Sequence, residues 1–164
     1  MDDVFEENQV SDEASSELIK KAIEISLRYL TLREYSQVEL KKKILQKQHF
    51  SPDILDQVFA QLREKNYLSD ERYIRQKSKL LKLKGYSTHY IQSYLEREEI
   101  TINKKDIEAL ELPSESECLQ MLIEKKLKGR QLDSLAYNKK NSIIRYLGSK
   151  GYSYSEIKEA FKSF

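Results

Sequence analysis

The chain has 164 residues, of which 39% are hydrophobic and 34% are charged, and its net charge is +2. Four glycines, two prolines and no tryptophan favour helices, and the single cysteine, Cys118, excludes an internal disulfide and a cysteine-based metal cluster. No apolar run approaches the roughly 20 residues of a membrane-spanning helix, and the acidic N-terminus lacks the pattern of a signal peptide. We therefore expect a soluble, cytoplasmic protein with no membrane contact.

The first 17 residues form an acidic segment. They contain seven acidic residues and neither lysine nor arginine, so the rest of the chain carries a net charge of +9. This composition predicts a disordered, solubilising tail over residues 1–16. The alternative is an acidic arm that competes with an acidic partner for the basic body of the protein.

Three helices are predicted over residues 17–68. The first carries apolar residues at helical spacing, namely Ile19, Ile23, Leu27 and Leu30. Ser36 with Glu39 has the pattern of a capping box, and Ser51 followed by Pro52 is a second helix start. Two such short helices cannot bury their apolar faces alone, so we expect a three-helix repeat.

A second three-helix repeat is predicted over residues 69–112. Ser69, with two acidic residues after it, begins a helix that runs to a glycine. Ser87 begins the next helix, which we expect to end near Glu99. A shorter helix follows Asn103 and ends by Pro113.

The third repeat is predicted over residues 113–164. Two further capping boxes begin helices there: Ser114 with Glu117, and Ser153 with Glu156. Another helix is expected around residues 138–148. The sequence thus predicts nine helices and no sheet.

Tyrosines recur with the period of these repeats. Tyr35, Tyr86 and Tyr137 lie 51 residues apart, and a residue suited to cap a helix follows each, the third being Asn138. The predicted fold class is all-α: an elongated array of three tandem three-helix repeats. The recurring tyrosines either plug gaps between helices or stack on exposed bases.

The residues that could carry catalysis are few. His49 and His89 have no acidic residue or cysteine at catalytic or metal-ligand spacing, and the chain has no glycine-rich phosphate loop. We predict no enzymatic activity, no cofactor and no metal site.

Basic residues are more informative. Between Arg72 and Lys84 the chain holds six basic residues and no acidic one. Helical spacing puts Arg72, Arg75, Lys79 and Lys82 in one sector, and Tyr73, Ile74, Leu80 and Leu81 in the opposite, packed one. An unmixed basic stripe favours a polyanion or an acidic protein groove as partner, the alternative being an ordinary solvated face. Lys77 and Lys84 project toward the apolar sector; Lys84 can extend past the helix end.

Smaller basic clusters lie in the other repeats. Their members are Lys41, Lys42 and Lys43, then Lys125, Lys126 and Lys128, then Lys139 and Lys140. Clusters in several repeats favour an extended positive surface over a single pocket.

Several motifs occur within residues 29–95. They are Arg33-Glu34-Tyr35-Ser36, Glu39-Leu40, Phe50, Leu68-Ser69-Asp70-Glu71-Arg72-Tyr73, Lys84-Gly85-Tyr86 and Ile91. In these motifs the chain resembles the RecX family, bacterial regulators of the RecA recombinase.

The resemblance implies a curved repeat array that lies in the groove of the RecA–DNA filament. It implies inhibition of ATP hydrolysis, strand exchange and co-protease activity, in DNA recombination, repair and the SOS response. The expected partners are the RecA filament and, weakly, single- and double-stranded DNA, with the chain itself a monomer. The filament-binding candidates are Arg72, Arg75, Lys79, Lys82, Lys84, Lys41, Lys42, Lys125, Lys126, Lys139 and Lys140.

Two questions stay open from the sequence. Arg72 has either a partner contact or a structural salt bridge, and Asp70 can cap the helix that carries it. The function itself has two rivals, a stand-alone DNA-binding module and a helical-repeat adaptor for another protein.

Overall fold

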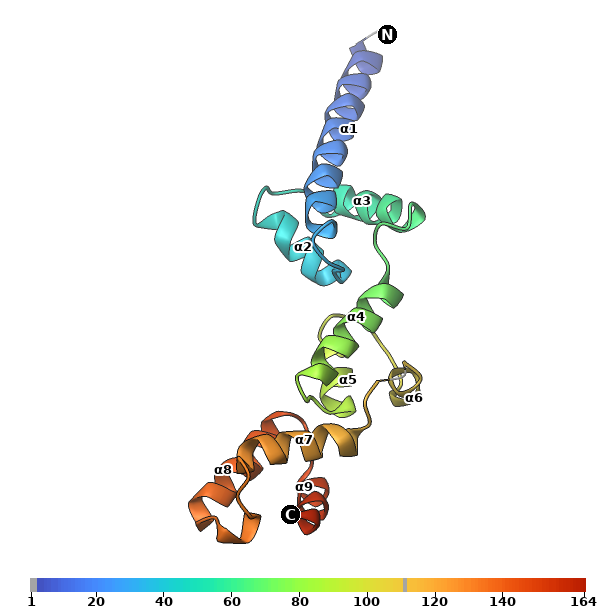
Figure 1. The fold of residues 1–164 in the computed structure, drawn as a ribbon. Helices are drawn as coiled ribbons and strands as arrows, with labels where there is room; N and C mark the ends of the chain where they lie inside the picture. The colour runs from blue at the N-terminus through green and yellow to red at the C-terminus, as the bar shows by residue number, and fades with distance from the viewer. Residues whose placement is uncertain (1–2, 111) are drawn as a thin grey trace. The chain divides into compact units, whose positions relative to one another are not determined.

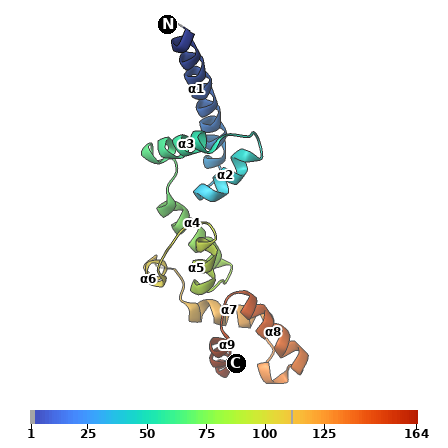
Figure 2. The ribbon, with the colours of Figure 1, turned by 180° about the vertical axis from the view of Figure 1, so that it is seen from behind.

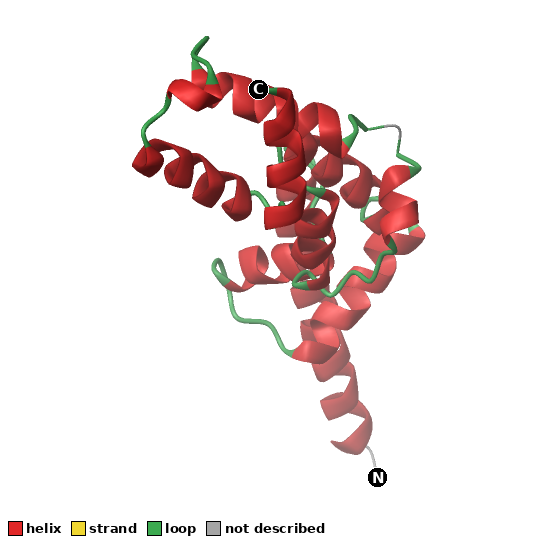
Figure 3. Cartoon of the chain, turned by 90° about the horizontal axis from the view of Figure 1, so that it is seen from below, coloured by secondary structure: helices red, strands yellow, loops and turns green. Residues whose placement is uncertain are grey.

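The computed structural model describes residues 3–110 and 112–164, with side chains from residue 14 onward. Over these residues it consists of α-helices, two short 3-10 helices and loops, with no strand (Figure 3). The predicted all-α class is therefore confirmed. The chain divides into two compact units, an N-terminal unit, Met1–Tyr73, and a C-terminal unit, Ile74–Phe164.

The N-terminal unit contains α1 (Asp3–Leu30), α2 (Gln37–Leu45) and α3 (Pro52–Glu64). Both short helices pack against α1 (Figures 1 and 2). Their core is formed by buried side chains that include Leu40, Ile44, Val58, Phe59 and Leu62. The predicted starts are confirmed, because the hydroxyl of Ser36 accepts the Glu39 N–H at 3.0 Å and that of Ser51 accepts the Ile54 N–H at 3.5 Å.

The predicted acidic tail differs from the structure. Residues 1–16 were expected to be disordered, yet α1 begins at Asp3 and includes residues 3–16. Residues 1–2 lie outside the described part of the chain. The segment has no glycine or proline to end a helix. It therefore extends the helix that Ile19 and Ile23 pack into the core.

Six helices follow α3. They are α4 (Asp70–Leu83), α5 (Thr88–Glu96), α6 (Lys104–Glu108), α7 (Glu115–Leu127), α8 (Tyr137–Ser149) and α9 (Tyr154–Ala160). The N-terminal unit contains the first turn of α4, and the C-terminal unit contains the rest of that helix. Within the C-terminal unit α5 packs against α6, and α7, α8 and α9 pack on one another (Figure 1). The expected second and third repeats thus share one compact unit, and the division into three repeats stays a prediction.

The helix starts of the C-terminal unit agree with the sequence except at α8. The capping boxes at Ser114 and Ser153 are both present. However, α8 begins at Tyr137 with Ala136 as its N-cap, so the predicted cap Asn138 is wrong. Tyr137 is also 77% exposed, whereas Tyr35 is 6% exposed, so the third tyrosine does not plug a gap as the first does. The ends of α5 and α6 come earlier than expected, at Glu96 and Glu108.

Two similar turns meet inside the C-terminal unit. Lys84-Gly85-Tyr86-Ser87 joins α4 to α5, and Lys150-Gly151-Tyr152-Ser153 joins α8 to α9. The N–H of Ser87 donates to the carbonyl of Lys150 at 2.9 Å, and its hydroxyl donates to the carbonyl of Gly151 at 2.8 Å. The two turns are therefore held together by direct backbone contact.

Glycine is required on both sides of this contact. Gly85 has φ +75° and Gly151 has φ +92°, a region that other residues adopt only with strain. A Cβ on Gly151 would lie 2.7 Å from Cβ of Tyr90, and one on Gly85 would lie 2.8 Å from the methyl groups of Leu122. A side chain at Gly151 would therefore clash at the contact between the turns, whereas one at Gly85 would clash with Leu122 of α7.

A buried ion pair lies beside the two turns. The side chain of Lys82 is 4% exposed, and its Nζ lies 3.8 Å from Oε1 of Glu115, whose side chain is 28% exposed. The same carboxylate accepts the N–H of Thr88 at 2.5 Å. Burial alone would raise the pKa of Glu115, but the Thr88 hydrogen bond and the charge of Lys82 outweigh it and lower that pKa. Glu115, at the start of α7, therefore binds both α4 and α5.

We expect Gly151→Ala to lower the free energy of unfolding by about 2–4 kcal/mol, because it adds both backbone strain and a clash. Gly148→Ala is the matched control, since a Cβ there meets nothing within 4 Å and the residue lies within α8. That change should be neutral or stabilise by about 0.5 kcal/mol. Urea unfolding followed by circular dichroism measures both, and equal effects would contradict the proposed close contact.

Mutations of Glu115 and of Lys82 should change the free energy of unfolding by unequal amounts. Glu115→Gln keeps an acceptor for Thr88 but leaves a buried ammonium without its counter-charge, so we expect a loss of about 1–3 kcal/mol at pH 7. Lys82→Met removes the buried charge and should change stability by less than about 1 kcal/mol. Adding Lys82→Met to Glu115→Gln should restore most of the loss in urea unfolding.

The same pair should make stability depend on pH. Because the pKa of Glu115 is lower in the folded chain than its ordinary 4.5, its ionised form stabilises the fold above that pH. This contribution is lost as the pH falls through the folded-state pKa. Unfolding measured from pH 7 to pH 3 should therefore show a smaller loss for Glu115→Gln than for the native chain, and parallel losses would refute the assignment.

Candidate partner-binding surface

The basic stripe predicted on α4 is only partly present. Of its members, Arg75 and Lys79 are exposed, as a partner-binding role requires, and so is Lys84, which directly follows α4. Lys82 is buried, at 3% of its full exposure, and pairs with Glu115. Its placement on the exposed face was wrong, because Lys82 lies at the edge of the predicted arc, where α7 covers it. Conversely, Leu80 was expected in the packed face and is 45% exposed.

Arg72 has a structural environment within the N-terminal unit. Its Nε donates to the carboxylate of Glu34 at 2.7 Å, and its Nη1 donates to the side-chain oxygen of Asn66 at 2.7 Å. Its Nη2 donates to the carbonyls of Asn66 and Tyr67. The guanidinium thus secures the turn before α4, where Asn66 has a φ of +56°. The helix itself is capped by the Ser69 hydroxyl, which accepts the N–H of Arg72 at 3.3 Å.

Lys77, which helical spacing directs toward the apolar sector of α4, contacts an aromatic ring. Its ammonium lies 4.5 Å from the ring centroid of Tyr94 in α5, a cation–π contact. Lys77 lies at the border of the packed face. Its side chain can therefore point toward the apolar sector while its ammonium contacts the Tyr94 ring.

The remaining basic candidates divide into exposed and engaged residues. The exposed ones in α2, α7 and α8 are Lys41, Lys42, Lys125, Lys126 and Lys139. Of these, Lys126 lies 3.8 Å from the centroid of the Tyr146 ring. Lys140 is half-buried, with its Nζ 3.6 Å from a carboxylate oxygen of Asp133.

Tyrosine rings of the C-terminal unit contact one another and lysines. The rings of Tyr86 and Tyr90 are stacked with centroids 4.2 Å apart, and Lys150 lies 3.7 Å from the centroid of Tyr86. Lys150 also lies 5.8 Å from the centroid of Tyr146. These contacts favour a packing role for the rings over base stacking. Sequence reasoning missed Lys150, although its place in the second Lys-Gly-Tyr-Ser turn was a signal.

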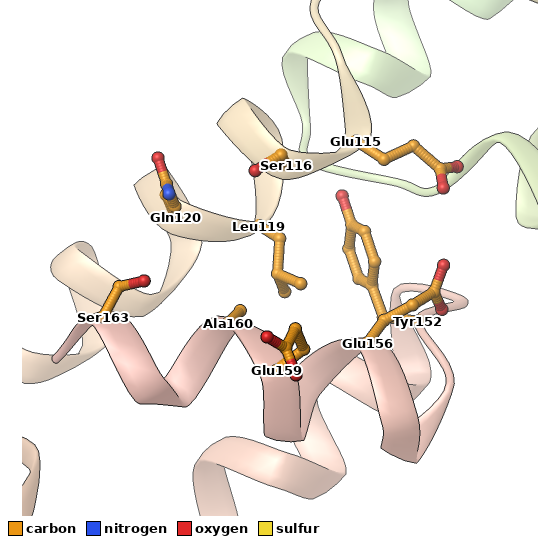
Figure 4. A pocket seen from close by; sticks show the side chains of 9 residues that line it. All are labelled: Glu115, Ser116, Leu119, Gln120, Tyr152, Glu156, Glu159, Ala160 and Ser163. Atoms are coloured by element: carbon orange, nitrogen blue, oxygen red, sulfur yellow. The ribbon is translucent and has the colours of Figure 1, made fainter.

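A cavity of about 330 Å³ lies between α7 and α9 (Figure 4). Its acidic side chains are already engaged: Glu115 with Lys82, Glu156 with the N-cap Ser153, and Glu159 with Lys162. Tyr152 also lines it, and burial raises the pKa of this phenol well above its ordinary range, so it stays protonated at neutral pH. The cavity is thus lined by carboxylates that already bind other groups of the fold and by a protonated phenol.

Among the described residues, no three metal-ligating side chains gather closely enough to hold an ion. Likewise, none of the helices in the described part of the chain is both long and apolar enough to cross a membrane. His49 and His89 are both exposed.

No family model matches the chain, but known proteins resemble it over most of its length. The protein named Regulatory protein RecX from Syntrophotalea carbinolica is 26% identical over 140 residues, which cover 83% of this chain and 91% of that protein. Its namesake from Vibrio cholerae is 26% identical over 146 residues, which cover 84% of this chain and 90% of that protein.

Solved structures share the fold. A crystal structure of regulatory protein RecX superposes with a TM-score of 0.69 at 19% identity, covering 93% of this chain and 77% of that one. The crystal structure of RecX from Lactobacillus salivarius gives a TM-score of 0.65 at 20% identity, covering 90% of this chain and 97% of that one. The sequence relatives and the motifs of residues 29–95 support the RecX family of regulatory proteins for this chain, and the solved structures show that it shares the fold of RecX proteins.

Proposed function

We propose that the chain is a non-enzymatic, cytoplasmic regulator of the RecA recombinase. It binds the RecA–single-stranded DNA filament in its groove as a monomer and inhibits ATP hydrolysis, strand exchange and co-protease activity. Similarity to proteins named Regulatory protein RecX supports a regulatory role. The finer activities are what the family resemblance implies.

The observation that carries the proposal is the exposed basic part of α4. Arg75, Lys79 and Lys84 project from a helix whose other side is buried and anchored through Lys82. Cations on a rigid element attract a negatively charged filament over a distance of about one Debye length, roughly 8–10 Å at physiological salt. The exposed lysines of α2, α7 and α8 are weaker candidates for the same role.

Two other functions also fit a basic helical protein. A stand-alone DNA-binding module would bind bare DNA tightly, and its affinity would fall steeply with salt because phosphate contacts release counterions. A helical-repeat adaptor would bind another protein and leave RecA unaffected. A RecA ATPase assay on single-stranded DNA, combined with a binding assay on bare DNA, separates all three.

The native chain should inhibit RecA ATPase at concentrations well below those that coat bare DNA. The triple change Arg75→Glu/Lys79→Glu/Lys84→Glu should raise the half-inhibitory concentration at least about tenfold, because three attractive charges become repulsive. Helicity by circular dichroism should be unchanged, since all three side chains are exposed.

The matched control carries the same change in net charge at exposed lysines elsewhere, Lys65→Glu/Lys105→Glu/Lys158→Glu. It should inhibit like the native chain. Equal weakening by both triple variants would show a nonspecific charge effect and remove α4 from the proposal. If the native chain leaves the ATPase unchanged but binds bare DNA in a salt-sensitive way, the DNA-binding module replaces the proposed function.

A further inference from the structure

The outer face of α4 combines leucines with lysines. We define it as Lys79, Leu80 and Leu83 of α4 together with Lys84, the first residue after that helix, all in the C-terminal unit. Leu80 is 45% exposed and Leu83 is 63% exposed, while both lysines are exposed. At about 100° per residue these four side chains span an arc of about 140°, in the order Lys79, Leu83, Leu80, Lys84. The two leucines therefore form the centre of the face, and a lysine stands at each edge.

This arrangement differs from an ordinary solvated helix surface. Single exposed leucines are common and need no explanation. Here two lie side by side, and the last three turns of α4 contain no acidic residue. The buried side of the same helix is already complete, with Tyr73, Leu81 and Lys82 in the interior. The two leucines thus lie outside the buried side of α4.

An apolar centre with a charged rim is the arrangement of a protein–protein contact. Interfaces between proteins concentrate apolar anchors at the centre and polar groups at the edge. A phosphate backbone gains nothing from leucines, and single-stranded bases stack on aromatic or guanidinium planes rather than on aliphatic side chains. The two lysines select a partner surface that carries carboxylates around an apolar depression.

We infer that the outer face of α4 docks on an acidic, partly apolar protein surface and not on nucleic acid. The inference rests on the proposed function, and within it the face contacts the RecA protein of the filament while the DNA is contacted elsewhere or not at all. Leu80 and Leu83 are the short-range anchors. Lys79 and Lys84 orient the approach and reject basic surfaces.

The test is the double change Leu80→Ser/Leu83→Ser, which leaves the net charge and every lysine in place. Its matched control is Met121→Ser, on α7 of the same unit, where the methionine is 47% exposed. Each chain is measured for inhibition of RecA ATPase on single-stranded DNA, and for binding to the bare labelled oligonucleotide by fluorescence anisotropy. Circular dichroism checks that helicity is unchanged.

We expect the leucine variant to raise the half-inhibitory concentration at least about tenfold, while its affinity for the bare oligonucleotide stays within about twofold of native. Met121→Ser should match the native chain in both assays. Undiminished inhibition by the leucine variant overturns the inference and leaves the proposed function standing. A parallel loss of oligonucleotide binding overturns it as well, because the face would then take nucleic acid. Absence of inhibition by the native chain itself overturns the proposed function, and the inference with it.

Discussion

The close approach of two Gly-Tyr-Ser turns determines the arrangement of the C-terminal unit. Ser87 reaches the backbone of Lys150 and Gly151, and the contact leaves no room for a side chain at Gly151. This contact places the start of α7 beside the end of α4, where Lys82 meets Glu115. A buried ammonium is costly without its carboxylate, so the pair makes any other alignment of these helices unfavourable. The register of α4 follows from this constraint, and with it the set of side chains that a partner can reach.

Local features of the fold were predictable from the sequence because they depend on a few neighbouring residues. A serine at an N-cap bonds to an N–H three residues later, and Ser36, Ser51, Ser87, Ser114 and Ser153 all do so. The prediction of Asn138 as an N-cap failed because α8 begins at Tyr137, so its N-cap is Ala136, two residues before Asn138. The extent of α1 also exceeded expectation, since acidity alone does not prevent a segment without glycine or proline from continuing a helix.

The orientation of α4 was not predictable in the same way. Helical spacing gives the order of residues around the axis, but neighbouring helices decide which arc is buried. With α7 beside it, the buried arc shifts so that Lys82 enters the interior and Leu80 leaves it. The number of basic residues also overstated the surface that a partner could bind, because several of them make contacts within the fold. Lys77, Lys126 and Lys150 lie over tyrosine rings, and Arg72 secures a turn.

A mixed leucine and lysine face suits the proposed task better than a purely basic one. Charge attracts at long range but is screened by salt, and any nucleic acid competes for it. A regulator that acts on a DNA-bound filament works where bare DNA is abundant, so a surface made of cations alone would be occupied by DNA. Leu80 and Leu83 contribute only when they meet a complementary apolar surface, and phosphates offer none. Under the proposed function, the lysines of α4 therefore set how fast the filament is found, and the leucines set which component of it is bound.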